Sequence, residues 1–111
     1  MPLTSGDCLR FLEKIKSDTE ISTVRVVIKG RVQRVGFRYW VIDEAGARNL
    51  RGWVRNHHTG DVEAVFLGPN ALIEEMVTIC RQGPAVAHVE SIQRYPAEAP
   101  NEEGFQCLPT V

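Results

Sequence analysis

The fold is decided by the stretch VRVVIKGRVQRVGFRYWVIDEAGAR, residues 24–48. Residues 24–29 are rich in β-branched side chains, which favours a short strand. Further along, Phe37, Val41 and Ala45 recur at intervals of four, which places them on one face of a helix over residues 37–48. Between strand and helix lies a loop that begins at Gly30 and ends at Gly36. The stretch therefore predicts a β-α unit.

The rest of the chain continues with a hairpin and a second β-α-β connection. Strands are expected at residues 51–56 and 61–67, and the loop between them is short enough for a hairpin. We expect Trp53 to belong to the core. Asn70 is expected to cap a second helix, which Gly83-Pro84 would end. Two further strands are expected at residues 89–95 and, more briefly, near residues 105–108.

The resulting order, β-α-β-β-α-β, predicts an α+β fold. Its simplest packing places both helices on one face of an antiparallel sheet, the ferredoxin-like arrangement. We assign residues 23–111 to this domain and residues 1–22 to an N-terminal extension. The extension is expected to be helical, because residues 4–7 have the T-x-x-D form of a capping box and apolar residues follow at one-face spacing: Cys8, Phe11, Leu12 and Ile15.

Composition excludes several classes of protein. The 111 residues are 43% hydrophobic and 24% charged, which is typical of one globular domain. The three cysteines are scattered and form no C-x-x-C motif, which argues against a disulfide framework or a zinc site. No apolar segment approaches the about 20 residues needed to span a bilayer. Together with the absence of an apolar N-terminal signal, this predicts a cytoplasmic protein that does not associate with membranes.

Charge is distributed unevenly along the chain. The formal net charge is -1, which excludes a generally basic nucleic-acid binder. Residues 21–56, however, hold eight Lys or Arg and only two Asp or Glu. We therefore expect an anionic ligand to bind somewhere in this basic stretch.

The loop from Gly30 to Gly36 is the best candidate for that site. Free N–H groups and the positive end of a helix would meet there, which suits an anion. Arg31, Arg34 and Arg38 add positive charge. The loop is not a Walker A motif, because Phe37-Arg38 follows its last glycine in place of Lys-Ser/Thr. It also holds no cysteine, which argues against a cysteine-nucleophile phosphatase.

At this point a family resemblance is plain. The run Gly30 to Arg38, followed by Gly52 to Asn56, resembles the signature pair of the acylphosphatases, and the likeness extends through residues 60–64 and 83–84. The resemblance implies hydrolysis of the carboxyl–phosphate bond of small acyl phosphates without a metal ion. We expect no cofactor, and we expect the protein to be a monomer. The resemblance assigns catalysis to Arg38 and Asn56. It assigns the phosphate-binding loop to Arg31, Val32, Gln33, Arg34, Val35 and Gly36.

The implied residues suit the reaction. The planar guanidinium of Arg38 can hold two phosphate oxygens at once. Asn56 is too weak a base to take a proton, but its carbonyl can align the attacking water. The leaving carboxylate is a weak base, so no strong general acid is required. One departure stands out: Arg34 occupies a position where the family usually has glycine. It must either accept a left-handed backbone at a cost of about 1–2 kcal/mol or shift the loop.

Three alternatives remain open at the level of sequence. The first is a non-catalytic anion-binding module on the same fold, which Arg34 would favour. The second is an RNA-recognition sheet, but the expected central strands of this chain lack the aromatic residues that such a sheet requires. The third is the acylphosphatase-like domain that begins certain large carbamoyl-transfer enzymes, for which the chain is short and has no zinc-type cysteine clusters.

Overall fold

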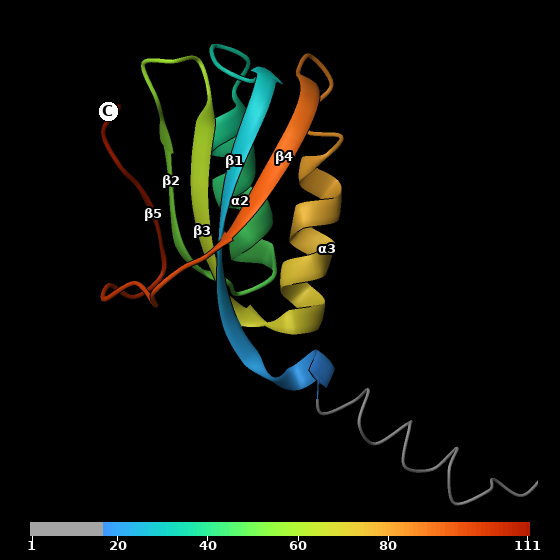
Figure 1. The fold of residues 1–111 in the computed structure, drawn as a ribbon, viewed down its shortest axis with the longest axis vertical. Helices are drawn as coiled ribbons and strands as arrows, with labels where there is room; N and C mark the ends of the chain where they lie inside the picture. The colour runs from blue at the N-terminus through green and yellow to red at the C-terminus, as the bar shows by residue number, and fades with distance from the viewer. Residues whose placement is uncertain (1–16) are drawn as a thin grey trace, which may run out of the picture.

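The computed structural model describes residues 17–111 (Figure 1). Most of the helix predicted in the extension lies outside these residues, and only residues 17–19 are seen, as helix. β1 begins at Ile21, two residues before the predicted start of the domain. In chain order the elements are β1 (Ile21–Arg31), α2 (Phe37–Ala47), β2 (Arg51–Asn56), β3 (Val62–Pro69), α3 (Asn70–Cys80), β4 (His88–Pro96) and β5 (Phe105–Cys107).

The sheet confirms the predicted ferredoxin-like arrangement, and the short strand predicted near residues 105–108 forms its edge as β5. Its order is β4-β1-β3-β2-β5, and the first four strands pair antiparallel. The short β5 pairs parallel with β2, so the complete sheet is mixed. Both helices cover the same face of the sheet, and the other face is open (Figure 1).

The core lies between the sheet and the two helices. Alternate residues of each strand point to the helix side, as the period of a strand requires. Phe37 and Phe66 are the largest of the fully buried side chains. Burying each of them stabilises the fold by about 1.5–3 kcal/mol. The strands contribute Val26, Ile28, Val54, Val62, Ala64 and Phe66 to this core, and the helices contribute Phe37, Val41, Ala45, Ile73, Met76, Val77 and Cys80.

Two local predictions are wrong. Asn70 does not cap α3: the residue preceding the helix is Pro69, and no side chain caps it. The Asn70 side chain instead donates to the carbonyl oxygen of Ser17 and accepts from the Ser22 hydroxyl. Trp53 is not a core residue, because it is half-buried on the open face beneath the Arg55 guanidinium, 4.7 Å from its ring centroid.

The topology explains why two distant signatures meet. β1 and β2 both pair antiparallel with β3, so they run parallel to each other and end at the same edge of the sheet. The loop after β1 and the turn after β2 therefore lie at one end of the molecule (Figure 1). Within the described residues, no helix is both long and apolar enough to cross a membrane.

Candidate active site

A small cavity of about 130 Å³ opens at the edge where β1 and β2 end. It brings Arg38 and Asn56 together, although they come from different elements. Arg31 and Val35 do not line it: Arg31 is the last residue of β1 and pairs with His88 of β4, whereas Val35 packs against the core. The lining residues are Val32, Gln33, Arg34, Gly36, Phe37, Arg38, Tyr39 and Asn56.

The loop backbone has an unusual geometry. Arg34 has a φ of 62°, so it adopts the left-handed conformation that the sequence left as one of two possibilities. Gly36, with a φ of 76°, is the residue before the first turn of α2 and adopts this conformation without a steric cost. Among the described residues, no backbone carbonyl accepts from the N–H groups of residues 32–36. These amides are therefore free to donate to an anion at the start of α2.

Arg38 differs from most basic residues of the domain. Its side chain lies in the first turn of α2, half-buried, and makes no hydrogen bond or ion pair within residues 17–111. Elsewhere, Arg25, Lys29, Arg48, Arg55 and Arg94 each pair with a carboxylate. No acidic residue lines the cavity. An unpaired guanidinium beside free amides favours a ligand with negative charge.

Asn56 presents an unused acceptor in the same cavity. Its backbone is fixed, because it pairs with Val62 across the hairpin and its carbonyl oxygen accepts from the Val111 amide at 3.1 Å. The side-chain oxygen Oδ1 is buried and has no hydrogen-bond partner among the described residues. A buried acceptor without a partner is costly, so such an atom is expected to accept from a bound water or ligand.

Gln33 connects the two halves of the site. Its side-chain Nε2 donates to the carbonyl oxygens of His57 at 2.6 Å and of Asp61 at 2.9 Å. Both acceptors belong to the turn that follows Asn56. The Gln33 side chain therefore fixes the loop and Asn56 relative to each other. From the sequence, Gln33 was expected in the site only as a residue of the phosphate-binding loop.

Tyr39 also lines the cavity, and sequence reasoning did not identify it. Its side chain is 71% exposed beside Arg38. A usable signal was its position directly after Arg38, in the first turn of a helix whose N-terminus faces the loop. The two hydrogen bonds from Gln33 to the turn could not be predicted from the sequence, because they depend on where the hairpin lies in the folded structure.

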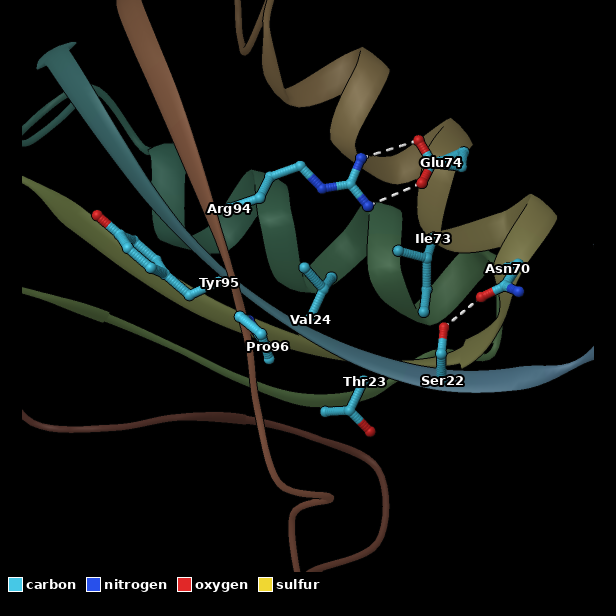
Figure 2. A pocket seen from close by; sticks show the side chains of 9 residues that line it. All are labelled: Ser22, Thr23, Val24, Asn70, Ile73, Glu74, Arg94, Tyr95 and Pro96. Carbon is cyan, nitrogen blue, oxygen red and sulfur yellow. Dashed lines mark hydrogen bonds and ion pairs between the residues drawn. The ribbon is translucent and has the colours of Figure 1, made fainter.

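A second hollow lies at the opposite end of β1, between β1, α3 and β4 (Figure 2). It is larger, about 300 Å³. Figure 2 shows the Arg94 guanidinium reaching from β4 to the Glu74 carboxylate on α3, with nitrogen–oxygen distances of 2.9 and 2.7 Å. The Ser22 hydroxyl donates to Asn70 on the same side. The Arg94, Glu74, Ser22 and Asn70 side chains are thus already paired.

The two described cysteines lie outside the small cavity. Burial raises the pKa of the Cys80 thiol to about 12, so this cysteine is not a nucleophile at neutral pH. Cys107 is exposed and lies in β5, outside the lining of the small cavity. Within residues 17–111, no three His, Cys, Asp or Glu side chains lie close enough to hold a metal ion together.

The structure defines a ferredoxin-like domain with a small cavity at the end of the sheet where β1 and β2 end. Residues 24–107 match the family model for acylphosphatase. The chain is 51% identical over 90 residues to an acylphosphatase of Azorhizobium caulinodans, covering 80% of this chain and 97% of that one. Against an acylphosphatase of Nitrobacter hamburgensis the identity is 46%, over 78% of this chain and 94% of the relative.

Solved structures agree with these sequence relatives. The crystal structure of acylphosphatase from Bacillus subtilis matches with a TM-score of 0.73 and 32% identity, over 80% of this chain and 99% of that one. The chain therefore belongs to the acylphosphatase family. It is an enzyme that hydrolyses acyl phosphates.

Proposed function

We propose that this enzyme cleaves the carboxyl–phosphate bond with the groups that line the small cavity and without a metal ion. The phosphate would accept hydrogen bonds from the free amides of residues 32–36 and from the Arg38 guanidinium. The single observation that carries the proposal is that Arg38, the unpartnered Oδ1 of Asn56 and the loop residues line one cavity of about 130 Å³; these loop residues are Val32, Gln33, Arg34 and Gly36.

The reaction needs little from the protein beyond charge and position. Asn56 Oδ1 accepts a hydrogen bond from a water, whose oxygen attacks phosphorus opposite the leaving group. The bond between phosphorus and the acyl oxygen breaks, and its electron pair leaves with the carboxylate. The water proton passes to an oxygen of the substrate phosphate. Arg38 and the amides stabilise the charge on the equatorial oxygens in the transition state.

We further propose that the enzyme acts as a cytoplasmic monomer, without nucleic acid or membrane. Light scattering on the purified protein tests this point, since a mass of one chain is expected at the concentrations used for assays.

The test of the proposed reaction is hydrolysis of benzoyl phosphate in the presence of EDTA. We expect steady turnover that the chelator does not reduce, with benzoate and inorganic phosphate as products. Binding of inorganic phosphate without turnover would instead support the non-catalytic anion-binding module. Turnover that EDTA abolishes and Mg²⁺ restores would contradict the metal-independent mechanism.

A further inference from the structure

A buried carboxylate on the open face of the sheet, opposite the two helices, is connected to the small cavity through hydrogen bonds. Glu63 lies in the middle of the sheet on β3 and is only 5% exposed. Its Oε2 accepts from Arg25 Nη1 at 2.7 Å, and its Oε1 accepts from Arg55 Nε at 2.7 Å. The His57 Nε2 lies 3.0 Å from the same Oε1. Burial raises the pKa of this carboxyl, but the hydrogen bonds from His57, Arg55 and Arg25 outweigh it, and the pKa lies below its ordinary value.

Two of these three partners are the immediate neighbours of Asn56. Successive side chains of a strand point to opposite faces, so Arg55 and His57 share the open face while Asn56 points away from it. One carboxylate oxygen, Oε1 of Glu63, thus holds the residue before and the residue after Asn56. The Arg55 guanidinium is further fixed by stacking on the ring of Trp53.

The same network reaches the phosphate loop. The carbonyl oxygen of His57 accepts from Gln33 Nε2 at 2.6 Å, and the His57 amide donates to the Asp61 carbonyl oxygen at 2.9 Å. Glu63 is therefore linked through His57 to Gln33, a residue that lines the cavity. The third partner, Arg25 on β1, makes an equally short ion pair but lies beside Tyr95 of β4, away from Asn56.

We propose that Glu63 is a positioning residue, which aims the Asn56 side chain at the attacking water by holding Arg55 and His57. The proposal rests on the proposed role of Asn56 in the reaction. A water-aligning oxygen must be held within a fraction of an ångström, because a small displacement lowers the rate without weakening phosphate binding. Loss of Glu63 is therefore expected to lower kcat and to leave the affinity for phosphate unchanged.

The chain offers a matched pair of variants for the test. Arg25→Gln and Arg55→Gln each remove one 2.7 Å ion pair to the same carboxylate, but only Arg55 adjoins Asn56. With benzoyl phosphate as substrate, we expect Glu63→Gln and Arg55→Gln to lower kcat about tenfold. Arg25→Gln is expected to keep kcat within about twofold although it destabilises the fold. In all three variants the inhibition constant of inorganic phosphate should remain at the wild-type value.

A double-mutant cycle separates positioning from a general structural effect. In an Asn56→Ala background, Glu63→Gln should lower kcat no further, because the group that it positions is gone. Equal losses in the Arg25 and Arg55 variants, or a loss from Glu63→Gln that persists in the double variant, would overturn the proposal. If Glu63→Gln does not fold, the two arginine variants decide the question by themselves.

Failure of this inference can be told apart from failure of the proposed reaction. If wild-type protein does not hydrolyse benzoyl phosphate, the proposed reaction fails. If wild-type protein is active and Asn56→Ala loses activity, but the two arginine variants behave alike, only the role of Glu63 is overturned.

Discussion

The two ends of β1 carry two cavities of opposite character. The cavity at the N-terminal end is about 300 Å³, and its arginine, glutamate, serine and asparagine are paired with one another. The cavity at the C-terminal end is about 130 Å³, and it holds an arginine without an ion pair and an asparagine oxygen without a partner among the described residues. Size alone would favour the first cavity.

The contrast shows that unused hydrogen-bonding capacity identifies the site better than volume does. Paired groups have already gained their interaction energy within the fold, so a ligand would have to replace it. Unpaired buried groups are costly in the free protein, and a ligand that pairs with them recovers that cost.

The largest effect is expected from Arg38→Ala. The substitution removes the half-buried one of the two unpaired arginines that line the small cavity, so both phosphate binding and turnover should be lost. We expect a decrease in kcat/KM of about a thousandfold or more, the range found for arginines that stabilise phosphoryl transfer. Assays with benzoyl phosphate and inhibition by inorganic phosphate measure both losses. Arg81→Ala, at the exposed end of α3, serves as the control and should keep wild-type rates.

Gln33→Ala should have a smaller effect on activity than Arg38→Ala. It removes the two hydrogen bonds that hold the turn after Asn56 against the loop. We expect kcat/KM to fall about tenfold, because the two halves of the site lose their register. Steady-state kinetics at pH 7 measure the change. Gln82→Ala at the exposed end of α3 is the control, and an equal loss in both variants would contradict the role given to Gln33.

Arg34→Gly should affect stability. The left-handed backbone of Arg34 costs about 1–2 kcal/mol, and glycine relieves this cost. Glycine also gives the unfolded chain more conformational freedom, which lowers the free energy of unfolding by about 0.5–1 kcal/mol. We therefore expect urea unfolding to show a gain of about 0.5–1 kcal/mol. Asn49 has a similar φ of 55°, but asparagine tolerates that conformation, so Asn49→Gly should gain less. Destabilisation by Arg34→Gly would show that the arginine makes a compensating interaction.

The smallest effect is expected at the large cavity. Arg94→Gln breaks both contacts with Glu74, but the two side chains are 38% and 61% exposed. The loss of unfolding free energy should therefore stay below about 1 kcal/mol. Rates on benzoyl phosphate should not change, because this end of β1 takes no part in the reaction. A clear loss of activity would mean that the larger cavity also contributes to function.

Much of the fold could be predicted from the sequence, because its signals are local. The strand predicted at residues 51–56 coincides with β2, and the helix predicted over residues 37–48 is α2. The prediction that Asn70 caps α3 was wrong because its side chain hydrogen-bonds to Ser17 and Ser22, which are 53 and 48 residues away. The prediction that Trp53 belongs to the core was wrong because the aromatic character of a side chain does not show which face of the strand it occupies.

The candidate site could be predicted in part. Arg38 and Asn56 were identified from two motifs, and the parallel course of β1 and β2 brings them to one cavity. The hairpin register alone would have placed Arg55 opposite Glu63. The contacts from Arg25 to Glu63 and from Gln33 to His57 join residues 38 and 24 positions apart, and no local pattern encodes them.

The most direct test of the account is the separation of binding from turnover in Asn56→Ala. We expect kcat for benzoyl phosphate to fall about 10²–10³-fold, because Asn56→Ala removes a group that acts on the transition state. Inorganic phosphate should still inhibit with its wild-type constant, because Arg38 and the loop amides remain. Near-full activity in Asn56→Ala, or loss of phosphate binding together with turnover, would contradict the assignment of Asn56 to the attacking water.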